Sequence, residues 1–218
     1  MIQNTEQEQL SAAQSVTGSL GQTLSLLPKQ YLNALIKPTV GTYREGLHGA
    51  SWASVWIQLL IWAIFDGLLG FLVTIITPAN AMTVTSSAQL SPVLQTALSL
   101  STTLGLIVLV PAFFFIFMGM MFAIARALGG TGTFLGQCHV SMLYLVPVGL
   151  GSKLLSFVPV VGKVLTYVLS LYGIGLQVVA VMAAHNLSKG KATAVVAVSL
   201  AVLLVLVGVP FLLVNFIK

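Results

Sequence analysis

The chain has 218 residues, of which 57% are hydrophobic and only 6% are charged. Soluble domains carry roughly a quarter charged residues, so this composition excludes a water-soluble globular protein and indicates a membrane protein. The net charge of +5 does not indicate nucleic-acid binding, because the basic residues are dispersed at the ends of apolar segments rather than gathered in one patch.

The first part of the chain is polar. Residues 1–28 are rich in Gln, Ser and Thr and are predicted to form a disordered tail, since they contain too little apolar surface to fold. In residues 29–50 apolar side chains recur at steps of three to four, which predicts an amphipathic helix at the membrane surface. We expect Pro38 to divide this helix, because the residue before a proline disfavours helical conformations. A partner-binding helix is the alternative.

The rest of the chain, residues 51–218, predicts one membrane domain. A helix of about 20 residues crosses the ~30 Å hydrocarbon core, and it satisfies its own backbone groups there. We therefore predict an all-α polytopic bundle with five transmembrane helices, at about 51–77, 97–125, 134–158, 164–184 and 192–217. The second stretch is longer than a bilayer requires, which predicts tilt, an interfacial first turn or a bend at Pro111. Pro147 is expected to interrupt the third.

Basic residues beside the spans predict the orientation, because Lys and Arg are enriched in cytoplasmic loops. With a cytoplasmic N-terminus, the outer side holds Lys153, Lys163 and Lys218, and the inner side holds twice as many basic residues. The predicted topology is N-in, C-out. The inner residues are also candidate contacts to the membrane surface: Lys29, Lys37, Arg44, Arg126, Lys189 and Lys191.

Asp66 is the single acidic residue inside a predicted span. An ionised carboxylate is costly in hydrocarbon, so the position suggests a proton or cation site, with His139, Arg126 or Lys163 as a partner. The alternative is a neutral, hydrogen-bonded Asp that fixes helix packing. Gln177 is expected to hydrogen-bond between helices or to contact a substrate. The candidate intramembrane polar site therefore comprises Asp66, His139 and Gln177.

The sequence does not indicate a metal, a cofactor or an enzyme. Cys138 is the single cysteine, and no two histidines stand at helical spacing, so a zinc or haem site is not expected. The HExxH, GxSxG and Walker motifs are absent, which argues against hydrolases and nucleotide-binding enzymes of those types. His185 stands beside a polar break and is expected at a solvated helix end.

Four stretches carry a resemblance to a known family: IKPTVGTYREG before the first span, RALGGTGTFLGQ as the link into the third, LVPVGLGSKLLSFVPVVG in the hairpin between the third and fourth, and LYGIGLQVVAVMAAHNLSKGKATAVV across the last two. In this order they resemble the Yip-one family, the Ypt/Rab-interacting integral membrane proteins. The resemblance implies a cytoplasmic N-terminus and five spans. The acidic DLYGP-type motif of eukaryotic trafficking members is absent, so the chain is similar to the prokaryotic branch, for which Rab binding is not implied.

The resemblance implies a non-enzymatic protein that organises or recruits partners at the membrane, in membrane shaping or trafficking. Its expected partners are the lipid bilayer and either a second copy or other membrane proteins. It is expected in the plasma membrane of a prokaryote, or in the ER and Golgi membranes of a eukaryote. The alternative function is a small transporter or channel that uses Asp66 and the broken third span as a polar path.

Overall fold

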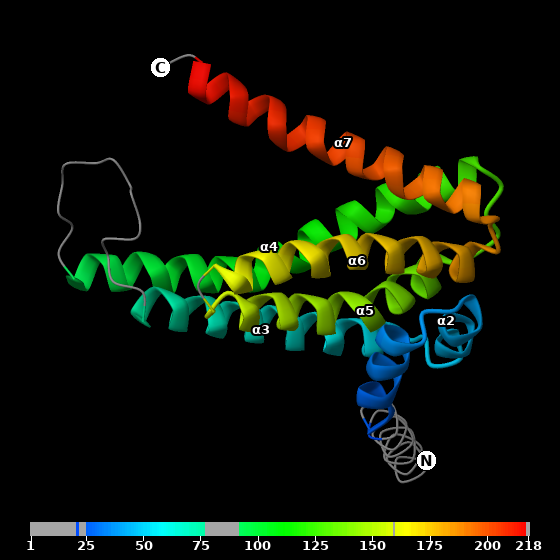
Figure 1. Ribbon diagram of the computed structural model, residues 1–218, viewed down its shortest axis with the longest axis horizontal. Coiled ribbons are helices and arrows are strands. Elements are labelled where there is room, and N and C mark those ends of the chain that lie inside the picture. The colour runs from blue at the N-terminus through cyan, green and yellow to red at the C-terminus, as the bar shows by residue number, and fades with distance from the viewer. Residues whose placement is uncertain (1–20, 22–24, 77–91, 159, 217–218) are drawn as a thin grey trace, which may run out of the picture.

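The computed structural model describes residues 21, 25–76, 92–158 and 160–216, and there the chain consists of helices joined by short turns (Figure 1). This confirms the predicted all-α class. After a helical segment at 25–36 come α2 (Val40–Leu47), α3 (Trp52–Ile76), α4 (Pro92–Ala127), α5 (Phe134–Leu155), α6 (Val161–His185) and α7 (Lys189–Phe216).

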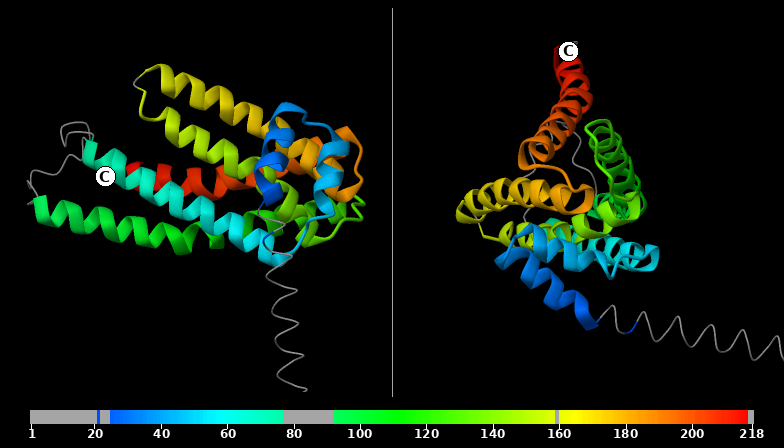
Figure 2. Two further views of the ribbon diagram at one scale, coloured as in Figure 1. Left: turned by 90° about the horizontal axis from the view of Figure 1, so that it is seen from below. Right: turned by 90° about the vertical axis from the view of Figure 1, so that its right-hand side faces the viewer.

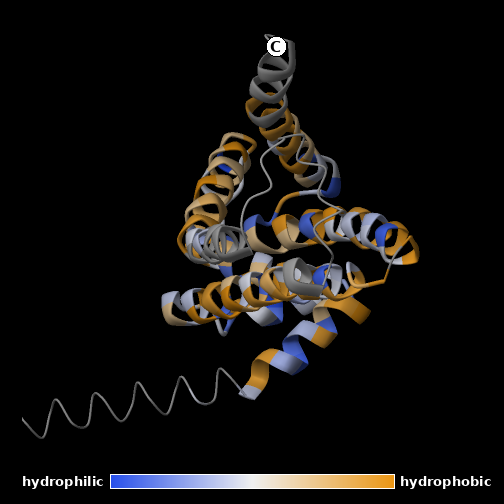
Figure 3. Cartoon of the chain, turned by 90° about the vertical axis from the view of Figure 1, so that its left-hand side faces the viewer, coloured by the Kyte–Doolittle hydropathy of each residue, from blue (hydrophilic) through white to orange (hydrophobic). Residues whose placement is uncertain are grey.

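The helices α3 to α7 each contain an apolar stretch long enough to cross a membrane, which confirms the five predicted spans. These stretches are Trp52–Leu72, Val108–Ala127, Phe134–Leu155, Val161–His185 and Lys189–Leu206. The helices alternate in direction, so that the N-terminal segment 25–47 and the end of α7 lie at opposite ends of the bundle (Figure 1). Hydrophobic colours predominate along the described parts of the long helices, with scattered hydrophilic residues, whereas segment 25–36 alternates between hydrophobic and hydrophilic (Figure 3).

The N-terminal segment contains two helices that meet at Pro38, as expected from the sequence. Thr39 caps α2, and its hydroxyl accepts a hydrogen bond of 3.2 Å from the Thr42 amide. Most of the predicted tail at 1–28 lies outside the described residues. Residues 25–28, however, are helical and not tail-like, because Leu27 is buried in a cluster with Ala34 and Tyr43.

Two spans differ from their predicted form. The helix α4 begins at Pro92 rather than at about 97, continues through Pro111 and changes direction along its length (Figure 1). The expected interruption of the third span is wrong, because α5 is continuous through Pro147. A proline is tolerated inside a membrane helix that is packed between neighbours, and α5 packs against both α3 and α6. Gly149, two residues further on, lets the Trp62 indole approach the α5 backbone closely.

The described core lies at one end of the bundle. We call this end, where segment 25–47 and the turns at 127–133 and 185–189 lie, the packed end, and the opposite end the open end. In α5 every residue from Gly136 to Tyr144 is buried, whereas the part after Val146 is partly or largely exposed. Towards the open end α7 diverges from its neighbours (Figures 1 and 2). Its side chains at 201–206 are exposed there.

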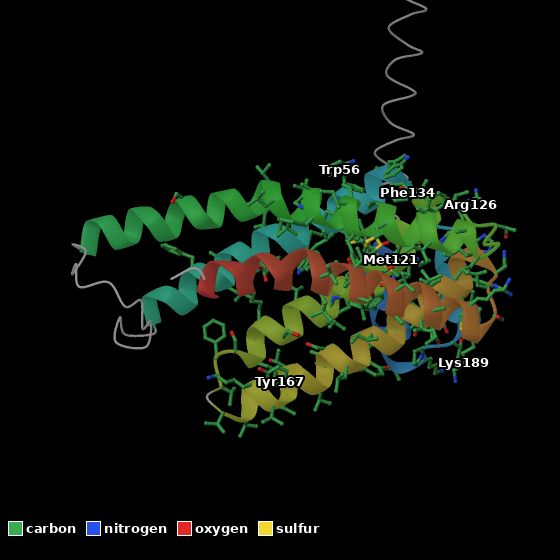
Figure 4. All side chains as sticks on the ribbon, turned by 90° about the horizontal axis from the view of Figure 1, so that it is seen from above. Trp56, Met121, Arg126, Phe134, Tyr167 and Lys189 are labelled. Carbon is green, nitrogen blue, oxygen red and sulfur yellow. The ribbon has the colours of Figure 1, made fainter. Side chains whose placement is uncertain are left out.

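Aromatic side chains join three helices beside this core. The Phe115 ring of α4 lies 5.1 Å from Trp56 of α3 and 6.5 Å from Phe134 of α5, measured between ring centroids. Trp56 and Phe134 lie along the same side of the bundle (Figure 4). Tilted aromatic pairs at such distances are favourable beyond the area they bury, so this cluster helps to fix how α3, α4 and α5 meet.

Candidate functional site

A hydrogen-bonded chain of buried polar groups crosses the packed end. His185, the last residue of α6, lies with its Nε2 atom 2.6 Å from Gln137 Oε1 of α5. The Gln137 amide nitrogen in turn donates to the backbone carbonyl of Met118 in α4, at 3.0 Å. Because Gln137 Oε1 can only accept, His185 carries its proton on Nε2. The chain therefore joins α4, α5 and α6 through one side chain of α5.

A second polar chain joins the bundle to the N-terminal segment. His139 Nδ1 of α5 lies 3.3 Å from the Ser54 hydroxyl of α3, and Gln58 Nε2 donates to that hydroxyl at 3.1 Å. The Tyr31 hydroxyl of segment 25–36 then donates to Gln58 Oε1 at 3.1 Å. Burial raises the pKa of the Tyr31 phenol above its ordinary value, so this group stays neutral and remains a donor. His139 is thus part of a structural connection between helices.

Gln177 makes the weakest of the buried polar contacts. Its Nε2 atom lies 3.4 Å from the Met121 sulfur, which is a weak acceptor, and 3.5 Å from the Ser141 hydroxyl, which is long for a hydrogen bond to oxygen. Its Oε1 atom is buried without a hydrogen-bond partner. The side chain joins α6 to α4 and α5, as expected for a residue that hydrogen-bonds between helices, but it does so loosely.

The turns at the packed end are held together by basic side chains. Asn186, which ends α6 in a left-handed conformation, accepts from the Arg44 guanidinium of α2 at 2.9 Å and donates to the Thr131 hydroxyl at 3.2 Å. Lys191 donates to the carbonyl of Leu128 at 2.9 Å. Cations favour such carbonyl-rich helix ends, so these side chains stabilise the turns.

The six candidate surface residues therefore form two groups. Arg44, Arg126 and Lys191 are exposed but hydrogen-bond to the chain itself, Arg126 to the carbonyl of Gly130 at 3.2 Å. Within the described parts of the chain, Lys29, Lys37 and Lys189 are exposed and make no side-chain hydrogen bond or ion pair. These three ammonium groups are the ones available to bind anions at the packed end.

The structure does not join Asp66 to the other two residues of the candidate polar site. Its carboxylate forms an ion pair with Lys153 of α5, with Nζ and Oδ1 3.3 Å apart. The expected partners His139, Arg126 and Lys163 are therefore incorrect. Asp66 and Lys153 lie in the open half of α3 and α5, whereas His139 and Gln177 are in the packed half. The ion pair neutralises the carboxylate within the protein.

The sequence does not predict that several polar residues of the packed end are buried and connect helices. His185, expected at a solvated helix end, is fully buried, because the turn at 130–132 covers its ring. Gln137 is one polar residue near the start of a predicted span, and the sequence does not show that it connects three helices. The signal that could have found both is their position in the terminal turn of a long apolar helix, where the helix end needs polar partners.

The arrangement offers hydrogen-bonding geometry rather than reactive groups. Among the residues that the structure describes, no three His, Cys, Asp or Glu side chains are placed to hold a metal ion. The buried polar atoms contact one another across helix boundaries. The packed end is therefore suited to holding the N-terminal segment 25–47 in a fixed position against the spans.

Comparison with known proteins agrees with this architecture. The family model of the Yip1 domain matches residues 32–210, which is most of the chain and includes α2 through most of α7. No match was found among curated proteins or among solved structures.

Proposed function

This chain belongs to the Yip1-domain family of multi-pass integral membrane proteins, and from that membership we propose that it organises or recruits partners at the bilayer without catalysing a reaction. The match to the Yip1 domain over residues 32–210 supports the role that the resemblance implies, a non-enzymatic membrane protein that acts with partners. The observation that carries the proposal is an amphipathic helix, residues 25–36, fixed to the packed end with part of its apolar surface exposed.

The inner face of this helix is firmly attached to the bundle. Leu27 and Ala34 are buried, and Tyr31 donates to Gln58 of α3. The hydroxyl of Tyr172 in α6 donates to the backbone carbonyl of Leu35 at 2.5 Å. A segment held at several points loses little further conformational entropy when it binds something else, so it is suited to presenting a surface.

The outer face of the same helix exposes large apolar side chains beside polar ones. Leu32 and Ile36 are 57% and 66% exposed, and Leu26 is also exposed. Lys29 and Lys37 lie beside them with unpaired ammonium groups. Exposed apolar side chains flanked by lysines are typical of helices that dock on a membrane surface or on a partner's groove. This outer face is the proposed recruiting surface.

The proposal is tested by changing only this outer face. In the full chain, in its own membrane, Leu32→Ser with Ile36→Ser is expected to abolish crosslinks between residues 25–47 and partner proteins, because it removes the exposed apolar surface. Glu45→Gln, an exposed change in α2, is the control and should leave the crosslinks unchanged. Crosslinks that persist in the double variant at the wild-type yield would overturn the proposal.

A further inference from the structure

A groove of about 470 Å³ lies at the packed end, between the start of α2, the last turns of α6 and the first turn of α7. This volume is within the range of ~300–1,000 Å³ typical of ligand sites. Its lining is mostly apolar and comprises Pro38, Thr39, Val40, Gly175, Val178, Val179, Met182, Lys189 and Thr193. The groove is separate from the outer face of helix 25–36 and from the buried polar chains.

The groove has an apolar wall and a single available charge. On α6 its lining residues Gly175, Val178 and Met182 follow one face of the helix, over a length of about 10 Å at 1.5 Å per residue. No atom lies within 4 Å of a Cβ built at Gly175, so this part of the wall is open space. At the other end lies Lys189, whose ammonium group has no partner among the described residues (Figure 4).

The hydroxyl groups of the groove are already used by the protein. The Thr193 hydroxyl donates to the carbonyl of Lys189 at 2.9 Å. The Thr39 hydroxyl caps α2 through the Thr42 amide. The polar chemistry left for a ligand is therefore one ammonium group at the first residue of α7, where the helix dipole also favours a negative charge.

The surroundings favour an anion as well. Within the described ranges, the packed end carries six Lys and Arg residues and one acidic residue, Glu45. Lys189 begins the apolar span Lys189–Leu206, so we expect its ammonium at the level where headgroups meet hydrocarbon. An apolar wall that runs from this level along a membrane helix matches the shape of a lipid, with its phosphate at the surface and its acyl chain below.

We propose that this groove binds one anionic phospholipid from the leaflet at the packed end, with its phosphate at Lys189 and an acyl chain along the Gly175–Met182 face of α6. The lipid completes the junction between α2, α6 and α7. A bound lipid is thus part of the surface that holds segment 25–47, and this goes beyond the proposed recruitment of partners.

Native mass spectrometry of the full chain in detergent tests the proposal with two lipids that share their acyl chains, dioleoyl phosphatidylglycerol and dioleoyl phosphatidylcholine. The wild type is expected to retain one phosphatidylglycerol in preference to phosphatidylcholine. Lys189→Gln should lower that preference about fivefold, the effect of one lysine near an anionic headgroup. Gly175→Phe fills the open part of the groove and should reduce retention of both lipids.

Lys29→Gln is the matched control, because it removes an exposed charge from the same end outside the groove. An equal loss of preference in Lys29→Gln and Lys189→Gln would overturn the proposal, since it would show charge attraction without a site. Unchanged retention in Gly175→Phe would also overturn it. A phosphatidylglycerol with a photoreactive acyl chain tests the wild type directly: crosslinks at residues 175–182 support the groove, and crosslinks confined to other helices contradict it.

Discussion

The two ends of this bundle are built from similar residues but are held together differently. At the packed end the spans meet around buried methionines, polar hydrogen-bonded chains and a docked N-terminal segment. At the open end α7 diverges from its neighbours, and valine and leucine side chains of α6 and α7 are exposed. Hydropathy is high along both. Apolar composition alone therefore does not distinguish helix surfaces that face protein from those that face lipid.

The difference shows what holds membrane helices together. In lipid, an apolar side chain gains little by moving from a hydrocarbon tail to a neighbouring helix, so close packing and hydrogen bonds decide where helices associate. The packed end has both: Gly130 and Gly132 lie against α6, and Gln137 bonds across three helices. It follows that the packed end should unfold as the cooperative unit, while the open end adapts to lipid.

The largest contrast is expected from one substitution made at both ends. Leu59→Ala removes a fully buried side chain of the packed end and should lower the free energy of unfolding by about 2–5 kcal/mol, because it leaves a cavity. Leu171→Ala removes a side chain that is 70% exposed on α6 and should change it by less than about 0.5 kcal/mol. Equal effects would contradict the distinction between the two ends.

The rate at which Cys138 is labelled reports on the opening of the packed end alone. It is the single cysteine of the chain and is fully buried beside the core of α5. A thiol-reactive dye therefore labels it only when the packed end opens. In detergent, Leu59→Ala should raise the labelling rate at a temperature below the unfolding transition, whereas Leu171→Ala should leave that rate unchanged.

The next effect concerns the turn that covers His185. A Cβ at Gly132 would collide with the backbone carbonyl of Ala184, which cannot move aside as a flexible side chain could. Gly132→Ala should therefore destabilise the protein by roughly 1–3 kcal/mol. Gly175→Ala is the matched control, because its Cβ meets open space and alanine is the better helix former. Cys138 labelling should accelerate in the first variant and stay the same or slow in the second.

A third comparison separates satisfied from unsatisfied polar groups inside the packed end. Gln137→Leu removes the hydrogen bonds that Gln137 makes with His185 and with the Met118 carbonyl. It should lower the free energy of unfolding by about 1–2 kcal/mol. Gln177→Leu removes two weak contacts and also a buried oxygen that has no partner, so it should be near neutral or stabilising. Thermal unfolding of the two variants in one detergent measures this difference. The reverse order of stability would contradict the assigned hydrogen bonds.

The sequence predicts those parts of the fold that depend on local chemistry. Apolar runs of about 20 residues determine the five spans, and Pro38 separates two short helices. It does not predict that Pro147 lies inside a continuous helix, because the neighbours that stabilise α5 come from distant parts of the chain. It also places the start of the N-terminal helix too late, because the burial of Leu27 depends on contacts made only in the folded bundle.

The candidate site was predictable only in part, for the same reason. The sequence indicates that Asp66 is unusual and that Lys153 lies near the end of a span, but not that α3 and α5 bring the two side chains together. It likewise does not show that His185 is buried, because the residues that cover it, at 130–132, belong to another turn. Which side chains meet between two helices depends on how the helices pack, and the pattern of residues along the sequence does not contain that information.

The smallest effect is expected at the open end, from the ion pair itself. Asp66→Asn removes one charge of the pair with Lys153, whose side chain is 36% exposed and can extend towards the interface. The loss should be about 1 kcal/mol, as for other polar contacts between membrane helices, because the remaining Lys153 ammonium can reach the interface. Exchange of the two charges, by Asp66→Lys with Lys153→Asp, should restore the stability if the carboxylate serves helix packing.

The same two variants separate packing from transport. A proton or cation path through Asp66 requires a carboxylate at that position on α3, so charge exchange would restore stability but not flux. In proteoliposomes with an imposed pH gradient, we expect the wild type and Asp66→Asn to show the same background flux, because the carboxylate is already paired with Lys153. Wild-type flux that Asp66→Asn abolishes would show that the open end, not the packed end, carries the function of this protein.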